Sequence, residues 1–169
     1  IPATVTKIEA SAFYASSTTY PYLTSVVFAA AEEGVEELPL EIMDEAFFGQ
    51  SELTTLALPA RISEFNTKIL DGLNNLKNIE ITGTMADGKY ASVEGMLTNA
   101  AKTEILYVPK ARTGKFTINT TSINTIGAYA LDNRDNLTEI VIPAHITEIK
   151  EGAFNDCDGI QTITFEGTA

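Results

Sequence analysis

The sequence predicts a repeat solenoid, a right-handed coil of short parallel strands joined by turns or short helical turns. Three observations predict this fold. The same apolar pattern returns after 23 residues, as from Leu56 to Ile79 and from Ile140 to Ile163. Apolar and polar residues alternate within each short segment, and a proline follows several of the segments. We therefore expect about six units of ~23 residues, one of them irregular, stacked so that they share one core.

The last repeat shows the unit most clearly, in the sequence LTEIVIPAHITEIKEGAFNDCDGIQTITF at residues 137–165. Its first strand ends at Pro143, because proline has no N–H to donate to a sheet. A second short apolar segment, residues 146–149, comes next, and the pair Ala153-Phe154 then forms a turn. No strand of three to five residues is stable alone, so we expect the copies to pair as a parallel sheet about 4.8 Å apart.

The spacing between the turn and the next strand supports one register for the copies. Six residues separate these positions in four copies, namely Phe47 to Leu53, Leu70 to Leu76, Leu131 to Leu137 and Phe154 to Ile160. In the first copy Phe13 and Leu23 are ten residues apart, which predicts a four-residue insertion around residues 16–20. The turn residues should stack into an apolar column, and each should contribute about 1.5–3 kcal/mol on burial.

Two stretches interrupt the period. Residues 29–37, AAAEEGVEE, lengthen the turn between the first two units, and residues 83–115 replace a regular unit. In the second stretch we expect a hairpin of residues 90–93 and 96–97, with turns at Gly95 and at Asn99-Ala100, and a strand at residues 105–108. We predict one domain over residues 1–169. Because neither end has a polar capping unit, we also expect that it is part of a longer chain or that a neighbour covers an end.

Composition excludes several classes of protein. The chain has 11 Lys and Arg against 23 Asp and Glu, a net charge of −12, which argues against a nucleic-acid partner and an anionic membrane surface. Its longest apolar run, residues 26–31, is too short to cross a bilayer. One Cys and one His rule out an internal disulfide and a two-His metal site. No nucleotide-binding or hydrolase motif is present, so we expect no cofactor and no enzyme activity.

Four features could carry chemistry, and each has a simpler structural explanation. His145 follows Pro143 at a turn position and should be solvated, and Cys157 is either a reactive thiol or a small buried side chain under the turn. Residues 156–159, DCDG, resemble the start of a calcium loop, but Gly167 stands where the bidentate Glu belongs. The acidic group at residues 32, 33, 36 and 37 is either a solvated loop or an ion or docking patch.

The outward positions of the strands are the best candidates for binding, because solenoids often bind partners on one extended face. By register these positions are Ser25, Val27, Thr55, Ala57, Asn78, Glu80, Tyr107, Thr117, Glu139, Val141, Thr162 and Thr164. The predicted face is small, polar and largely uncharged. Only Tyr107 has the aromatic character that is enriched at binding hot spots. The alternative is that this face is merely a solvated sheet.

The unit L-x-x-I-x-I-P-x-x-I-x-x-I-x-x-x-A-F-x-x-C-x-x-L resembles the BspA-like leucine-rich repeats of bacterial cell-surface proteins. Residues 137–160 match it nearly position by position, with Cys157 at the family's Cys position. Residues 125–130, TIGAYA, are similar to its T-x-I-G-x-x-A segment, and residues 90–118 to a variant unit common in the family. The sequence departs from the pattern at two kinds of position. Ser16, Gln50, Leu73 and Arg134 replace the Cys, and Leu70 and Leu131 replace the Phe.

The resemblance implies an exported bacterial protein, extracellular or at the cell surface, with no catalytic residues to assign. It implies a non-enzymatic adhesion module that binds protein or glycan on a host or neighbouring surface through the sheet face. Two alternatives stay open, a carboxylate-using hydrolase and a structural spacer that self-associates end to end.

Overall fold

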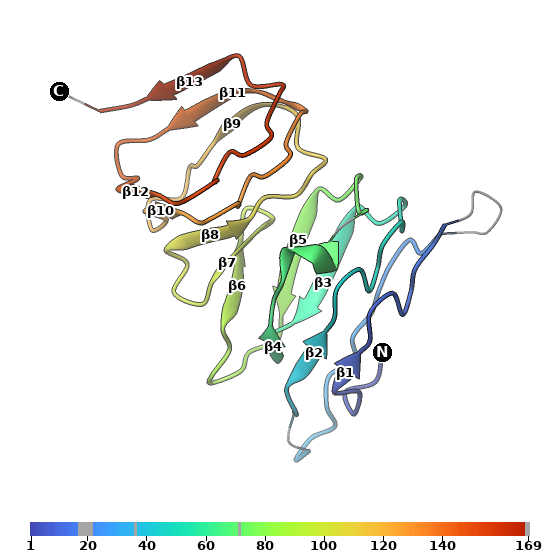
Figure 1. The fold of residues 1–169 in the computed structure, drawn as a ribbon. Coiled ribbons are helices and arrows are strands. Elements are labelled where there is room, and N and C mark those ends of the chain that lie inside the picture. The colour runs from blue at the N-terminus through green and yellow to red at the C-terminus, as the bar shows by residue number, and fades with distance from the viewer. Residues whose placement is uncertain (17–21, 36, 71, 168–169) are drawn as a thin grey trace. The chain divides into compact units, whose positions relative to one another are not determined.

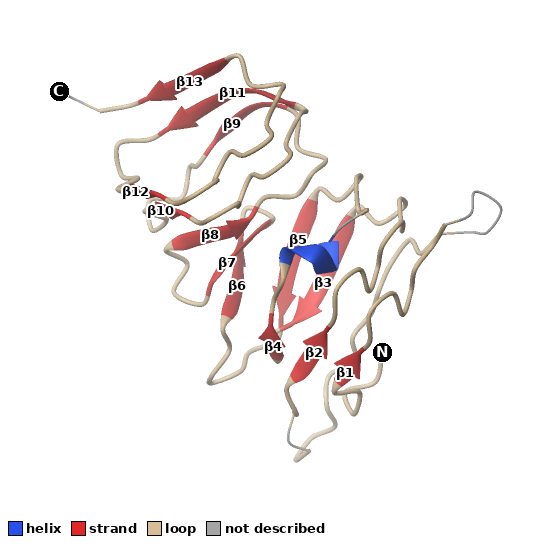
Figure 2. Ribbon diagram, viewed as in Figure 1, coloured by secondary structure: helices blue, strands red, loops and turns tan. Residues whose placement is uncertain are grey.

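The computed structural model describes residues 1–16, 22–35, 37–70 and 72–167 (Figure 1). The chain divides into two compact units, Ile1–Tyr90 and Ala91–Ala169, and each is described by itself. In both units short strands follow one another along a coiled chain, with loops and turns between them (Figure 2). This is the predicted solenoid, with little helix. The single domain over residues 1–169 stays a prediction.

The first unit contains two parallel sheets. One sheet has the order β1-β2-β4, formed by Lys7–Ile8, Leu40–Ile42 and Ile62–Glu64. The other pairs β3 with β5, formed by Thr55–Pro59 and Asn78–Thr82. A short 3-10 helix, η1 (Thr67–Leu70), follows β4. The repeat of residues 55–70 therefore supplies one strand to each sheet, β3 and β4, and η1 follows them.

The second unit repeats this plan. One parallel sheet has the order β13-β11-β9, formed by Thr162–Phe165, Leu137–Ile142 and Gly114–Thr117. The other sheet has the order β12-β10-β8-β7-β6, formed in that order by Glu148–Ile149, Thr125–Ile126, Glu104–Tyr107, Met96–Asn99 and Tyr90–Val93. Strand β6 begins with the last residue of the first unit.

The register of the strands confirms the predicted repeat. Leu56 lies opposite Ile79, and Ile140 lies opposite Ile163, each pair 23 residues apart in sequence. Alternate residues of β3 face inward, because a strand turns successive side chains to opposite faces. Leu56 and Leu58 are fully buried, whereas Thr55 and Ala57 between them are half-buried. The repeated apolar residues thus form the core.

The turn segment of each repeat is stacked on the next by backbone hydrogen bonds. In the first unit the Phe13 amide donates to the Ala46 carbonyl over 2.8 Å, and the Phe13 and Phe47 rings stack with centroids 5.3 Å apart. In the second unit the Leu131 amide donates to the Ala153 carbonyl over 2.8 Å. The turn residues therefore stack within each unit, as predicted. Phe47 and Leu131 are fully buried, whereas Phe13, in the first turn, is exposed.

The family's Cys position has one physical role in three of the repeats. Its side chain donates a hydrogen bond to the backbone carbonyl of the preceding turn. Cys157 Sγ donates to Leu131 over 2.8 Å, Gln50 Nε2 to Phe13 over 2.5 Å, and Arg134 Nε to Val108 over 2.6 Å. Thiol, amide and guanidinium thus satisfy equivalent carbonyl acceptors, of which the Val108 carbonyl is buried and the other two are partly buried. A fully buried carbonyl without a donor would cost about 1–3 kcal/mol.

The irregular unit contains the predicted hairpin and strand. Strands β6 and β7 are joined by Glu94 and Gly95, which both have positive φ (52° and 74°), as a two-residue hairpin turn of type I′ requires. A second turn follows Asn99, whose side-chain oxygen accepts a hydrogen bond from the Thr103 amide over 2.9 Å. Strand β8 then returns antiparallel to β7 and parallel to β10.

The first repeat differs from its prediction. Residues 23–28 carry the apolar pattern of a strand, but the structure assigns no strand there. The Ile1 ammonium instead donates to the Val27 carbonyl over 2.6 Å, and the Ala29 amide donates to the Ile1 carbonyl over 2.9 Å. Residues 17–20 of the first expected insertion lie outside the described residues.

Two register partners provide a test of the shared core. Ile140 of β11 is fully buried, whereas Ile163 of the edge strand β13 is 44% exposed. We expect Ile140→Ala to lower the free energy of unfolding by about 3 kcal/mol, because it leaves a cavity. Ile163→Ala should cost less than about 1 kcal/mol, because half of this side chain already contacts water. Urea denaturation followed by circular dichroism measures both values, and equal losses would contradict the assigned burial.

Candidate binding face

In the first unit the candidate face is the outward side of β3 and β5. Thr55 lies opposite Asn78, and Ala57 lies opposite Glu80. Asn78 and Glu80 are exposed, and the other two residues are half-buried. The inward neighbours Leu56 and Ile79 are buried, so packing of the core fixes which way the four outward side chains point. The structure therefore brings these four predicted residues together.

In the second unit the candidate face is the outward side of β9, β11 and β13. Glu139 lies between Lys115 and Thr162 in register. Lys115 Nζ and Glu139 Oε1 form an ion pair of 2.9 Å, with both side chains partly exposed. Such a surface pair adds little stability, typically about 0–1 kcal/mol, so it remains available to a charged partner. Sequence reasoning missed Lys115, although it stands two residues before Thr117.

The prediction for Tyr107 was wrong. Its side chain is only 4% exposed, and its ring lies under the Arg134 guanidinium, with the Cζ atom 4.6 Å from the ring centroid. Tyr107 lies on β8, which pairs with β7 and β10 rather than with β9. The apolar run at residues 105–108 resembles the first strand of a repeat, but most of it forms β8, which belongs to the β12-β10-β8-β7-β6 sheet. The spacing of Ile105, Ile126 and Ile149, at 21 and 23 residues, is the signal that places it there.

The prediction of an exposed Val141 was also wrong. Val141 is buried, whereas Thr164, its partner on β13, is exposed. The difference follows from position in the sheet. Strand β11 is central, so Val141 has Thr117 on one side and Thr164 on the other, and β13 is an edge strand. The described face in the second unit therefore consists of Thr117, Glu139, Thr162 and Thr164 together with Lys115.

His145 does not occupy the solvated position expected from sequence. Its side chain is half-buried, and its Nε2 atom is buried without a hydrogen-bond partner. Among the described residues, no group of three or more His, Cys, Asp or Glu side chains could hold a metal ion. No helix in the described ranges is long and apolar enough to cross a bilayer.

Cys157 is half-buried beneath the last turn and has a structural contact. Burial raises the pKa of its thiol, and a hydrogen bond and the charge of Arg134 oppose this only in part. The thiol remains protonated near neutral pH and donates to the Leu131 carbonyl. These features favour the small packed side chain over the reactive thiol.

Two buried arginines were not found by sequence reasoning. Arg61 and Arg134 are each 1% exposed. Arg61 Nη1 donates to the carbonyls of Val5 and Leu38 over 2.9 and 3.1 Å, so it joins three successive repeats. The structure gives neither arginine a salt bridge to a described carboxylate, and backbone carbonyls accept from both. Their places in the repeat could have identified them from the sequence. Arg61 stands two residues after Pro59, and Arg134 stands at the family's Cys position.

The comparisons with known proteins agree with the geometry. A model of the BspA type leucine-rich repeat region, in six copies, matches residues 1–96 and 110–169. The chain therefore belongs to the BspA-type leucine-rich repeat family, whose repeats stack as a solenoid. A search of the curated proteins gave no significant match.

Solved structures of similar fold come from bacterial leucine-rich repeat proteins. The pneumococcal vaccine antigen PcpA is 22% identical with a TM-score of 0.66, and the match covers 97% of this chain and 38% of that one. A leucine-rich cell-surface protein from Faecalibacterium prausnitzii is 22% identical with a TM-score of 0.58, covering 98% and 40%. The chain thus spans about two fifths of the length of these proteins. At this identity the likeness shows the fold alone.

The reactivity of the single thiol tests the packed site of Cys157. Burial in the folded protein raises the pKa of the thiol. We therefore expect the pH dependence of the alkylation rate with iodoacetamide to have its midpoint at a higher pH in the folded protein than in the urea-unfolded chain. In the unfolded chain that midpoint should lie at about 8.5. The chain has one Cys, so the alkylated mass reports this site alone. A midpoint at or below that of the unfolded chain would indicate an activated thiol instead.

Proposed function

We propose that this chain is a non-enzymatic interaction module at the outside of a bacterial cell, which binds protein or glycan on a host or neighbouring surface. The family supports a repeat module of this kind, and a structural relative is described as a cell-surface protein. The binding surface is the outward side of the β3–β5 and β9–β11–β13 sheets. Each unit contributes its own part.

One observation carries this proposal. In each unit, hydroxyl and carboxylate side chains that are exposed or half-buried lie in adjacent register on a sheet whose other side is core, and the first unit adds the exposed amide of Asn78. A rigid sheet holds such groups at fixed spacing without help from a ligand, which lowers the entropy lost on binding. The carboxylate-using hydrolase is less well supported, because Glu139 is engaged by Lys115 and the described face contains no second acid within its unit.

The first part of the face is tested by a double substitution on β5. We expect Asn78→Ala with Glu80→Ala to weaken binding of the matrix protein or glycan at least tenfold, because removing a polar interaction from a desolvated site costs about 1–2 kcal/mol. The ligand is first selected by a binding screen of the purified chain, and surface plasmon resonance then measures the affinity.

The matched control is Glu52→Ala with Asn74→Ala, which makes the same chemical changes at exposed positions away from the strands. This control should bind as the parent does. Unchanged binding by the β5 variant, or an equal loss of affinity in the control, would show that the outward side of β3 and β5 is not the binding surface.

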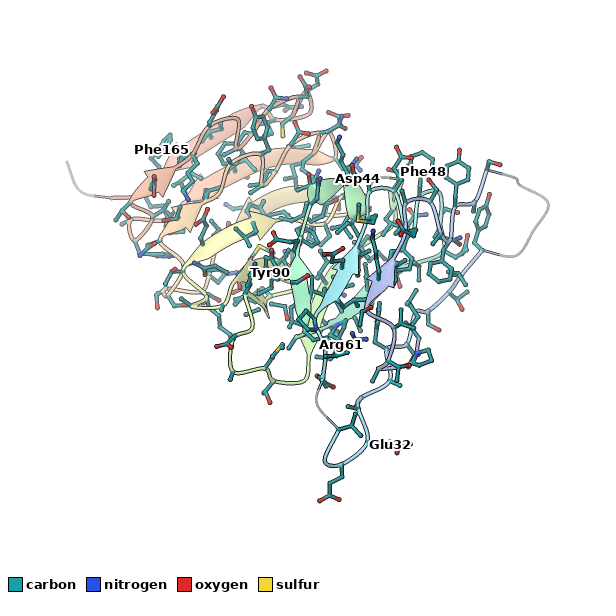
Figure 3. The ribbon with its side chains drawn as sticks, turned by 60° about the horizontal axis from the view of Figure 1, so that its bottom comes forward. Glu32, Asp44, Phe48, Arg61, Tyr90 and Phe165 are labelled. Atoms are coloured by element: carbon teal, nitrogen blue, oxygen red, sulfur yellow. The ribbon has the colours of Figure 1, made fainter. Side chains whose placement is uncertain are left out.

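A second candidate function, end-to-end self-association, is favoured by the edge of the second unit. On β13, Ile163 and Phe165 are 44% and 69% exposed, whereas their register partners on β11 are buried (Phe165 is labelled in Figure 3). An open edge strand with exposed apolar side chains is able to pair with another strand.

Substitution of this edge tests self-association. We expect Ile163→Glu with Phe165→Glu to lower the sedimentation-derived association constant at least tenfold, because it places two charges where apolar residues would meet. The control Thr162→Ala with Thr164→Ala changes the opposite side of the same strand and should leave association intact. A parent chain that stays monomeric at every concentration measured would exclude this function.

A further inference from the structure

The first unit contains a cavity that the solenoid does not need. Its volume is about 480 Å³, and it lies between the first residues of the chain and the loop that follows residue 28. Its apolar lining consists of Pro2, Ala3, three consecutive alanines at residues 29–31, Val35 and Leu38. Pockets of this size, mostly apolar with a few polar groups, are typical of ligand sites.

The loop that forms this cavity is an insertion in the repeat. Residues 29–37 lie outside the 23-residue period, so the regular stacking of strands does not explain them. Loops held by a rigid scaffold carry a large share of the binding residues in proteins. The alanines leave the space open, since larger side chains at the same positions would fill it.

Hydrogen bonds hold both sides of the cavity in place. The Ala31 amide donates to Glu37 Oε1 over 3.2 Å, which ties the two arms of the loop together, and the Val35 amide donates to the Glu32 carbonyl over 3.0 Å at the tip. The wall at the start of the chain is fixed by the Ala29 amide, which donates to the Ile1 carbonyl over 2.9 Å.

Arg61 connects this framework to the core. Its buried guanidinium donates to the Val5 carbonyl beside one wall and to the Leu38 carbonyl on the other. Arg61 lies in the body of the unit near β4, and Glu32 lies on the loop away from it (Figure 3). The cavity is therefore largely formed before any ligand arrives, which reduces the cost of binding.

The rim of the cavity is both apolar and acidic. Val35 and Leu38 are 54% and 47% exposed, so two large aliphatic side chains of the lining are partly in water. Glu32 lines the cavity, and Glu33 beside it is exposed. No Lys or Arg is among the described lining residues, so the local potential favours a cation. Glu36 lies outside the described residues and is no part of this argument.

We propose that this cavity binds an extended polypeptide segment of a partner, with one bulky apolar side chain inserted between the alanines and Leu38 and an adjacent Lys or Arg on Glu32. Apolar walls favour the inserted side chain, and the acidic rim selects its basic neighbour. The chain's net charge of −12 would steer such a segment toward it. This site is separate from the sheet face, so neither proposal depends on the other.

Binding of short synthetic peptides to the full 169-residue chain tests the site. The probe is fluorescein-labelled Gly-Lys-Lys-Phe-Lys-Gly-amide, and the comparison peptides replace its Phe by Ala or its three Lys by Glu. We expect the probe to bind at least tenfold more tightly than either comparison peptide by fluorescence anisotropy. Labelled-protein NMR should place the shifted amides at Ala3, Ala31 and Leu38.

Three variants separate this site from general charge attraction. Ala30→Trp should lower the affinity for the probe at least tenfold, because the larger side chain fills the cavity. Glu32→Lys should reverse the preference between the Lys and Glu peptides. Glu52→Lys makes the same charge change at an exposed position elsewhere and should keep the original preference. If Ala30→Trp fails to fold, the comparison of Glu32→Lys with Glu52→Lys still tests the proposal.

Three results would overturn the proposal. The first is equal binding of the Phe and Ala peptides, which would show charge attraction alone. The second is the same reversal of preference by Glu52→Lys and Glu32→Lys. The third is amide shifts confined to β3 and β5, which would place the peptide on the sheet face instead.

Discussion

The hydrogen bond from one repeat to the next is the constraint on which the rest of the structure depends. In the part of the chain that the structure describes, no strand exceeds six residues and several have two, so none is stable without its neighbours. Pairing in parallel register places residues 23 apart side by side, as Leu56 and Ile79 show. Side chains of similar character therefore lie in columns, and the apolar columns form the core.

The fold could be predicted from the sequence because this constraint is visible as a period. Alternation along β3 indicates that Leu56 and Leu58 are buried, and a glycine between two apolar segments indicates the hairpin at Glu94-Gly95. Most of the candidate face followed from the same register. Asn78 and Glu80 are exposed since their neighbours Ile79 and Ile81 point the other way.

The errors arose where local pattern and spatial partner differ. Tyr107 stands in an apolar run that resembles a first strand, yet its actual partners are β7 and β10, and long-range pairing is not readable from five residues. Val141 is buried because its strand is central, which depends on the neighbours on both sides. The cavity beside residues 29–38 depends on where a non-repeating loop returns, and periodicity does not determine that.

The family's Cys position, occupied by different residues in different repeats, shows how the sequence of a repeat can change while its structure is kept. A backbone carbonyl needs a proton donor of suitable reach, and the thiol of Cys157, the amide of Gln50 and the guanidinium of Arg134 all provide one. Three chemically different donors therefore fill the same role, whereas Leu73 at the equivalent position of another repeat is a buried apolar side chain without a donor. Chains can then drift to 22% identity and keep a common backbone course, as the match to the pneumococcal antigen illustrates. A comparison by residue type alone would miss the hydrogen bond that the Cys157, Gln50 and Arg134 positions share.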